Sequence, residues 1–458
     1  MLTSPPLDEP LLERRSTPTI PGVGVFEATI SLAKTCIGTG VMALPFAFQQ
    51  GAILSFPGLL ALGVWNWITC MQLVYARAAL PPPTIGAKGR AFRSTYSAVA
   101  YGAAGQVGIV LLEGSLSVML TGVCASLQVQ AAQLISASTD IDYFVAVLGT
   151  GIALIPLVLL RTLRNISFVA GGALLMVGIG LGAVTAYGFL VYGAPPADPR
   201  LLKAPHLNEF ALFFGITCFS FGTQSTLLPV QDGMMHPQRA AEAATYSLVA
   251  VTSLYAVVGA GLATLFWQAP DGVEQLILLN LPTPSPIATL VQLTSAAVAI
   301  LSYPFPLMPV IQLLPALLPA FGQQQPEAKA SRRSHGGTSD VGAGARLATL
   351  ATTTSLALLL QQFGVAASLC GCLNIISSQI LPPLCHLRLC VAPALERATA
   401  RRTLRAAAED GEATPEGGAW RAVSLRLLWL GDALLVLVGV GAFLYFAVQT
   451  MGEVAVAR

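Results

Sequence analysis

The sequence predicts an all-α polytopic membrane protein, and both its composition and its apolar runs support this fold class. Hydrophobic residues make up 54% of the 458 residues and charged residues only 10%, against about 25% charged residues in an average soluble domain. Apolar runs of about 20 residues, long enough to cross a bilayer as a helix, recur from Pro21 to the C-terminus. The composition therefore excludes a soluble protein.

Eleven apolar segments, separated by polar breaks, are the candidate transmembrane helices. They run roughly over residues 22–48, 51–76, 96–135, 142–160, 166–192, 208–231, 243–268, 285–320, 346–363, 365–391 and 423–449. The third and eighth segments are long enough to contain a break. A break that divided either of them into two spans would reverse the sidedness of the rest of the chain.

Positive residues fix the orientation of these helices, because Lys and Arg in short loops stay on the cytosolic side. With the N-terminus in the cytosol, that side holds all but four of the 24 Lys and Arg. The exceptions are Lys34, which lies within a span, and Arg200, Lys203 and Arg458 on the far side. We therefore expect eleven spans, a cytosolic N-terminus and a C-terminus on the opposite side.

The segments between the spans divide the chain into parts. Residues 1–21 lack the apolar core of a cleaved signal peptide, so we expect a cytosolic tail. Two five-helix repeats follow, over 22–192 and 208–391, and the second contains a Gly/Ser-rich cytosolic loop at 322–345. A cytosolic linker at 392–422, which alternates Ala with Arg and Glu, then leads to the eleventh helix.

Two of the spans carry helix breakers at matching places. The first contains Gly38-Thr39-Gly40 followed by Leu44-Pro45, and the sixth contains Gly222-Thr223 followed by Leu228-Pro229. Each of these spans opens a block of five. Interrupted segments at corresponding positions of two halves indicate an inverted-repeat transporter with its binding site at the bilayer midplane. The alternative is close helix packing, for which Gly and Pro are common in membrane helices.

An unwound stretch inside a membrane has a specific consequence. It frees backbone N–H and C=O groups that lipid cannot satisfy, so the stretch must line a cavity enclosed by protein. Freed N–H groups at the start of a half-helix attract a carboxylate. The two breaks are therefore the candidate binding site.

The residues around both breaks resemble the amino acid/auxin permease family, and most closely its proton-coupled and vacuolar amino acid transporter branches. The stretch LAKTCIGTGVMALPFAFQQGA, from Leu32 to Ala52, is similar to that branch's first-helix pattern of Lys, Ile-Gly-Thr-Gly, Leu-Pro and a following Gly. The stretch FGITCFSFGTQSTLLPVQDGMMHP, from Phe214 to Pro237, resembles the family's sixth helix. Weaker agreement is found at SYPFPLMPV in the eighth span and over 363–387 in the tenth.

This resemblance implies a LeuT-like fold, with five plus five inverted helices, broken helices 1 and 6 and one added helix. It also implies secondary active transport of small neutral amino acids by alternating access. By similarity, unwound backbone in the first span would hold the carboxylate and amino groups of the substrate, and the sixth span would line its side-chain pocket. These residues are Ile37, Gly38, Thr39 and Gly40 in the first span, and Phe219, Ser220, Phe221 and Gly222 in the sixth.

The sequence departs from the resembled branch at two places that bear on ion coupling. Proton-coupled members carry a histidine three residues before the motif lysine, where this chain has Ser31, and commonly an acidic residue after F-x-F, where it has Gly222. We still expect proton coupling, through other groups. The candidates are Lys34, one turn before the first break, and Glu113, the carboxylate deepest in a span, because ionisable residues inside membranes are costly and usually functional. The alternative for each is a structural pairing or hydrogen bond.

Sodium coupling is the rival within transport. Its candidate ligands are hydroxyls of the eighth span, Thr294, Ser295 and Ser302, which alternatively bond their own helix. We place Asp432 at a span end, where snorkelling explains it, and His386 at a span edge on the surface. The eight cysteines show no CxxC spacing, so we expect neither disulfides nor a metal, and no cofactor beyond the coupling ion, H⁺ or Na⁺.

An amino acid sensor that binds the same ligand without net flux is the rival from another class. An enzyme is not expected, because the chain shows no nucleophile–base pair, metal cluster or phosphate loop. The expected partners are an amino acid and the lipid bilayer, with no nucleic acid; the oligomeric state stays open and a monomer is compatible with the sequence. DEPLLE, at residues 8–13, resembles an acidic dileucine sorting signal, so the membrane is either of the vacuolar or lysosomal type or the plasma membrane.

Overall fold

The computed structural model describes the chain in eight stretches. They cover residues 22–80, 94–159, 167–193, 203–270, 272–282, 285–317, 343–408 and 416–456. The predicted tail at 1–21, with its DEPLLE motif, and residues 322–342 of the predicted Gly/Ser-rich loop lie outside the described residues.

The described residues form helices joined by short connections. The α-helices are α1 (Val25–Cys36), α2 (Leu44–Gly51), α3 (Ser55–Ala79), α4 (Thr95–Thr139), α5 (Tyr143–Leu159), α6 (Ser167–Tyr192), α7 (Leu207–Ser220), α8 (Gln224–Gly233), α9 (Ala240–Phe266), α10 (Pro286–Ser302), α11 (Pro304–Leu317), α12 (Ala343–Leu360), α13 (Phe363–Ile375), α14 (Leu381–His386), α15 (Ala392–Ala408) and α16 (Glu416–Val456).

Many of these helices are built to cross a membrane. Nine helical stretches in the described part of the chain are long and apolar enough to do so, and the apolar α5 is shorter. One of the nine, Thr39–Ala79, extends over two of the predicted segments. The prediction of an all-α polytopic membrane protein is therefore confirmed, whereas the count of eleven spans stays a prediction.

The third predicted span does contain a break. Within α4, Ala104 (φ −137°) and Gly105 (φ +59°) leave helical geometry, and a left-handed φ is readily adopted only by glycine. The chain folds back there, since Ser97 Oγ donates a hydrogen bond to Glu113 Oε1 at 3.1 Å across 16 positions of sequence; a continuous helix would separate these residues by about 24 Å. The segment 95–103 is too short to cross a bilayer, so it adds no span.

The eighth predicted span is interrupted but remains one apolar stretch. Helix α10 ends at Ser302 and α11 begins at Pro304, with Tyr303 between them in helical geometry. Proline lacks the N–H of the helical ladder, which explains an interruption at this point. Residues Pro286–Leu313 together are long and apolar enough to form one span.

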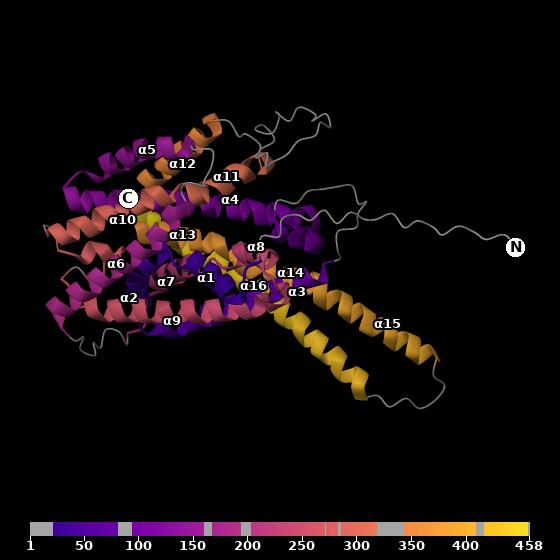
Figure 1. Ribbon diagram of the computed structural model, residues 1–458. Helices are drawn as coiled ribbons and strands as arrows, with labels where there is room; N and C mark the ends of the chain where they lie inside the picture. The colour runs from indigo at the N-terminus through magenta and orange to yellow at the C-terminus, as the bar shows by residue number, and fades with distance from the viewer. Residues whose placement is uncertain are drawn as a thin grey trace.

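Helices α1, α7 and α13 occupy the middle of the bundle, with α5 and α12 on one side and α9 on the other (Figure 1). The closest approach is between α7 and α13. A Cβ placed on Gly371 of α13 would lie 1.8 Å from the carbonyl oxygen of Gly215 in α7, so only glycine fits there. Small residues in this way bring the backbones of membrane helices together.

The eleventh predicted helix packs along the outside of this centre. Phe446 of α16 stacks on Phe214 of α7, with ring centroids 4.0 Å apart. Helix α15 occupies 392–408 of the predicted linker, and α16 already begins at Glu416. In Figure 1, α15 and the first part of α16 project from the bundle side by side.

Candidate functional site

The first interruption follows directly from the sequence Cys-Ile-Gly-Thr-Gly. Helix α1 ends at Cys36, and Ile37 (ψ 91°) and Gly38 (φ −142°, ψ −149°) are extended. A 3₁₀ turn over Thr39–Ala43 then leads into α2, which has Pro45 in its first turn, where a missing N–H costs nothing. The chain therefore leaves and regains helical geometry at the predicted place.

The second interruption lies at Phe-Gly-Thr. Helix α7 ends at Ser220, Phe221 is extended (φ −96°, ψ 91°), and α8 begins at Gln224. Both interruptions leave the last carbonyl groups of one helix and the first N–H groups of the next without partners in a helical ladder.

Two buried side chains satisfy several of these carbonyl groups. The hydroxyl oxygen of Tyr255, in α9, lies 2.7 Å from the carbonyl oxygens of both Cys36 and Ser220. A hydroxyl carries one proton, so it donates to one carbonyl at a time or is shared between the two. The Asn374 amide donates to the carbonyl oxygens of Cys218 and Phe221, at 3.1 and 2.9 Å.

The two interruptions also contact each other directly. A Cβ placed on Gly40 would lie 2.6 Å from Ser220 Oγ and 3.3 Å from Ser220 Cα. Cys36 Sγ lies 3.0 Å from Thr223 Oγ1, so these two groups share a hydrogen bond. Glycine at position 40 is thus required by a close approach between the two breaks.

A cavity of about 390 Å³ lies between the interruptions and the facing side of α10–α11. Its size falls at the lower end of the range of small-molecule sites, about 300–1,000 Å³. It brings together ten of the thirteen residues that the sequence nominated: Lys34, Ile37, Gly38, Thr39, Gly40, Phe219, Ser220, Gly222, Ser295 and Ser302. The rest of the wall includes Asn374 and Gln130, further residues beside the interruptions, and apolar side chains from α4, α6, α10 and α11. Those beside the interruptions are Thr35, Cys36, Met42, Ser225 and Thr226.

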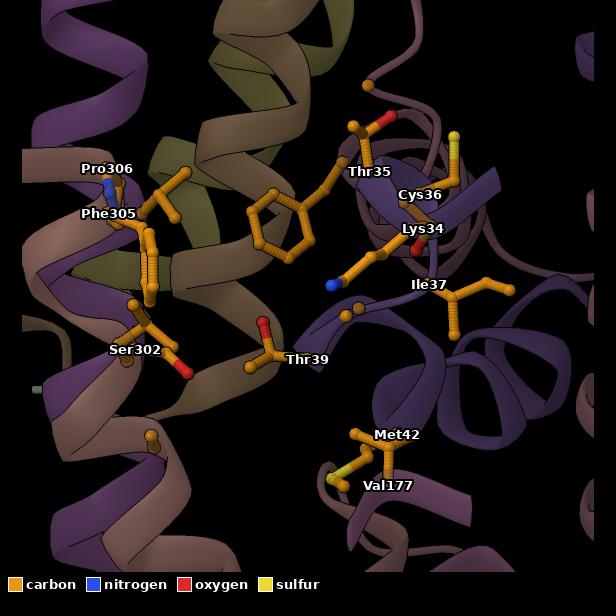
Figure 2. A pocket seen from close by; sticks show the side chains of 18 of the residues that line it. Lys34, Thr35, Cys36, Ile37, Thr39, Met42, Val177, Ser302, Phe305 and Pro306 are labelled. Atoms are coloured by element: carbon orange, nitrogen blue, oxygen red, sulfur yellow. The ribbon is translucent and has the colours of Figure 1, made fainter. Parts of the chain in front are cut away.

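Lys34 gives this cavity its charge. Its Nζ extends from the end of α1 into the open space, toward the wall formed by Ser302 and Phe305 (Figure 2). No Asp or Glu lies among the described residues that line the cavity, and within the described part of the chain Lys34 forms no ion pair. The cavity therefore presents a cation with no fixed counter-charge.

Three nominated residues lie outside the cavity. Phe221 is fully buried and packs edge-on against Tyr255, with ring centroids 5.2 Å apart. The Thr294 hydroxyl donates to the carbonyl oxygens of Leu290 and Val291, at 2.7 and 3.1 Å, so it is committed to its own helix. Glu113 is 5% exposed and accepts the hydrogen bond from Ser97 described above.

Sequence reasoning missed four residues that the structure brings into view. Tyr255 and Asn374 hold the helix ends, and a lone polar residue in an apolar span was the only sequence signal for either. His386 and Asp432, expected at the surface and at a snorkelling span end, instead form a pair with Nδ1 2.7 Å from Oδ2 and side chains 14% and 6% exposed. The surface placement of His386 was wrong, and pairing with His386 rather than snorkelling accounts for Asp432.

Known proteins resemble this chain in sequence. Residues 21–405 match the family model described as transmembrane amino acid transporter protein. The vacuolar amino acid transporter 4 of Saccharomyces cerevisiae is 26% identical over 297 residues, which cover 62% of this chain and 39% of that protein. The vacuolar amino acid transporter 3 of Schizosaccharomyces pombe is 28% identical over 321 residues, which cover 68% and 47%. The chain thus spans less than half the length of these curated relatives.

The fold agrees with this match. The inward facing conformation of Mhp1 superposes with a TM-score of 0.51 over 95% of this chain and 91% of that one, at 14% sequence identity. The chain therefore shares the fold of Mhp1. The members of this family are amino acid transporters rather than enzymes, in agreement with the expectation from the sequence. The family model covers most of the chain, and the chain therefore belongs to the transmembrane amino acid transporter family.

Proposed function

We propose that this chain is a secondary active transporter that carries small neutral amino acids by alternating access, with the substrate held in the cavity between the two interruptions. The observation that carries the proposal is that both interruptions open onto one cavity. In this proposal α1 and α2 are the halves of a broken first helix, α7 and α8 are the halves of a broken sixth helix, and the two belong to inverted five-helix repeats.

The chemistry of the cavity suits an amino acid backbone. The N–H groups of Thr39 and Gly40 begin a 3₁₀ turn and so lack a partner within it, and Lys34 adds a full positive charge nearby. A substrate carboxylate is attracted by both. Carbonyl oxygens at the ends of α1 and α7 carry partial negative charge and attract the substrate ammonium group.

The wall of the cavity favours small, neutral side chains. Leu127, Val177 and Val298 give it an apolar surface, on which a short aliphatic side chain packs well. A cationic side chain would share the cavity with Lys34 and find no carboxylate among the described residues of its wall, so Coulomb repulsion opposes it.

The same charge favours proton over sodium coupling. Ser295 and Ser302 line the cavity and supply hydroxyl oxygens of the kind that bind sodium. Lys34 extends into the same space from the opposite wall (Figure 2). A fixed ammonium there opposes the entry of a second cation, and sodium coupling through these two serines is the alternative.

The relatives and the charge pattern of the chain support a location and an orientation. The named relatives are vacuolar amino acid transporters, which supports a vacuolar or lysosomal-type membrane, with the plasma membrane as the alternative. The distribution of Lys and Arg supports a cytosolic N-terminus.

Uptake by the purified protein in liposomes tests this proposal. We expect concentrative uptake of radiolabelled alanine, serine or another small neutral amino acid when a pH gradient is imposed, and little uptake of lysine or arginine. Replacement of sodium by lithium or choline should leave the rate unchanged. Saturable binding without flux under every gradient would instead identify a sensor, and a strict need for sodium would identify the sodium-coupled alternative. Liposomes without protein supply the background.

A further inference from the structure

A buried imidazole–carboxylate pair joins α16 to the rest of the bundle. His386 Nδ1, at the end of α14, lies 2.7 Å from Asp432 Oδ2 in α16. The second carboxylate oxygen, Asp432 Oδ1, accepts a hydrogen bond from the Gln72 amide of α3 at 2.8 Å. Three helices far apart in sequence therefore meet at one titratable pair, and neither the binding cavity nor the predicted coupling residues include it.

A second group of buried amides lies beside the second interruption, on the same face of α3 as Gln72. Asn66, Thr69 and Gln72 lie three residues apart along one buried face of α3. Gln224, the first residue of α8, donates to Asn66 Oδ1 at 2.7 Å and to Thr69 Oγ1 at 3.0 Å. Gln379 donates to Asn66 Oδ1 at 3.1 Å. A row of polar side chains on α3 thus leads from Asp432 to the residue at which α8 begins.

The glutamine amides of this row have acceptor atoms that make no hydrogen bond within the described part of the chain. The side-chain oxygens of Gln72, Gln224 and Gln379 are buried without a hydrogen-bond partner in the described part of the chain. Buried acceptors without donors are costly and rare, so these amides have spare capacity to accept a donor when the network rearranges.

The helix geometry around the pair is also unusual. A π-helical turn at Ile376–Ile380 contains Gln379, and a second one, Leu387–Val391, begins directly after His386. Such turns are rare and recur at functional sites. They leave the backbone on both sides of the pair able to shift.

We propose that the His386–Asp432 pair binds the coupling proton, an inference that rests on the proposed proton-coupled transport. The carboxylate accepts from Nδ1–H, which leaves Nε2 of the neutral imidazole as the basic atom. Nε2 takes one proton from the aqueous side, and the charge of the pair changes from −1 to 0. When Nε2 releases the proton on the other side, the charge returns to −1.

The change in charge reaches the substrate cavity through α3. An imidazolium binds the Asp432 carboxylate more strongly than the neutral ring does. The hydrogen bond that the Gln72 amide donates to the same carboxylate then becomes weaker. Gln72 then rearranges beside Asn66 and Thr69, which hold Gln224 at the start of α8. Protonation at the pair therefore alters the hydrogen bonds that position one half of the second interruption.

The groups around the pair leave it as the titrating unit. Titratable residues beside the pair include Tyr75, Cys385 and Cys390 and the exposed Arg388 and Arg426. The helices packed around it also carry Cys70 and Arg77 on α3, and Tyr96 and Glu113 on α4. Glu113 is buried and accepts its hydrogen bond from Ser97, not from the pair. Tyrosine and cysteine are ordinarily neutral near pH 7, and arginine is charged at all relevant pH values. A histidine side chain, by contrast, changes its charge between about pH 5 and pH 8.

Transport by the full-length protein in liposomes tests the assignment. Asp432→Asn keeps the size of the side chain and removes its charge, and His386→Gln removes the titrating ring while leaving Gln72 bonded to Asp432. We expect both variants to exchange radiolabelled neutral amino acid across the membrane at equal pH as the wild type does. We also expect both to lose the stimulation of uptake by a pH gradient, down to the level without a gradient. His236→Gln, at an exposed histidine away from the cavity and the pair, is the matched control, and it should keep that stimulation.

The outcomes separate this inference from the proposed function. Gradient-driven uptake that survives in either exchange-competent variant would overturn the assignment. If Asp432→Asn does not fold, as judged by loss of amino acid binding, His386→Gln decides the matter alone. If His386→Gln also fails to bind, infrared difference spectra decide it on a variant with His206, His236 and His335 all replaced by Gln, in which His386 is the one remaining histidine. The absence of an imidazole protonation band when the pH is changed would overturn the proposal. Uptake by the wild type that ignores the pH gradient would contradict proton coupling itself, and no uptake at all would contradict the proposed transport.

Discussion

At the scale of single residues, the site depends on side chains that satisfy broken backbone. Tyr255 reaches one carbonyl at the end of α1 and one at the end of α7, so a single hydroxyl joins both interruptions. Gly40 permits the two interruptions to touch, because any Cβ there would overlap Ser220. The shape of the cavity therefore depends on the Tyr255 hydroxyl and on the absence of a side chain at Gly40.

Removal of the Tyr255 hydroxyl should weaken substrate binding. Tyr255→Phe removes the one donor that two buried carbonyl oxygens share, at a cost of about 1–3 kcal/mol, and we expect the apparent affinity for a neutral amino acid to fall about tenfold. Tyr143→Phe is the matched control, since Tyr143 also donates to a helix carbonyl, that of Ala357, at 2.9 Å but away from the cavity. Equal affinity in the two variants, measured by equilibrium binding, would show that Tyr255 does not position the site.

The two glycines at the interruptions should differ in their tolerance of a methyl group. Gly40→Ala forces Ser220 away from the first interruption, so we expect at least a tenfold loss of uptake. Gly222→Ala should stay near wild type, because the nearest atom to its Cβ would be the Thr35 carbonyl oxygen at 4.0 Å. Initial rates at matched protein density check this pair, and a functional Gly40→Ala would refute the close approach.

At the scale of elements, backbone hydrogen bonds join the start of α1 to the end of α8. Val23, just before α1, donates to the Gly233 carbonyl oxygen at 2.9 Å, and Met235 N–H donates to the Val23 carbonyl oxygen at 3.1 Å. These bonds form an isolated bridge between Val23 and Met234. In the proposed transport cycle we therefore expect helix α1 and helix α8 to move as one unit.

A cross-link across this bridge should leave transport intact. Paired residues of such a bridge lie within the reach of a disulfide, about 4.4–6.8 Å between Cα atoms, and Val23→Cys with Met234→Cys should still support uptake after oxidation. Thr39→Cys with Ser302→Cys, bridged across the cavity by a short bifunctional reagent, should block uptake (Figure 2). If oxidation of the first pair abolishes uptake and reduction restores it, α1 and α8 must separate during transport.

The sequence predicted these elements unevenly. Composition and apolar length were sufficient for the helical spans, and Gly and Pro marked both interruptions to within a residue or two. The fold-back of α4 at Gly105 was not located, because Ala104-Gly105 within an apolar run reads equally well as continuous helix. The fold-back brings Ser97 into hydrogen-bond contact with Glu113, 16 positions away. A pattern of neighbouring residues does not encode such a contact.

At the scale of the whole molecule, the same limit applies to the site. The residues near the breaks were predictable, because Gly-Thr-Gly and Phe-Gly-Thr carry their own signal. Partners drawn from distant helices were not: Tyr255 lies 219 positions from Cys36, and Gln72 lies 360 positions from Asp432. Three-dimensional packing brings these groups together. It explains why Asp432, which the sequence placed at a span end, belongs to a buried hydrogen-bond network.

The central claim is that the cavity between the two interruptions holds the transported amino acid, and substrate protection of Ser302→Cys tests it most directly. Ser302 faces the cavity (Figure 2), whereas the eight native cysteines of the described chain are buried or only partly exposed. A small charged methanethiosulfonate reagent should inhibit uptake by Ser302→Cys and not by wild type, and a saturating neutral amino acid should slow the modification at least tenfold. Modification that proceeds at the same rate with and without the amino acid would contradict the account.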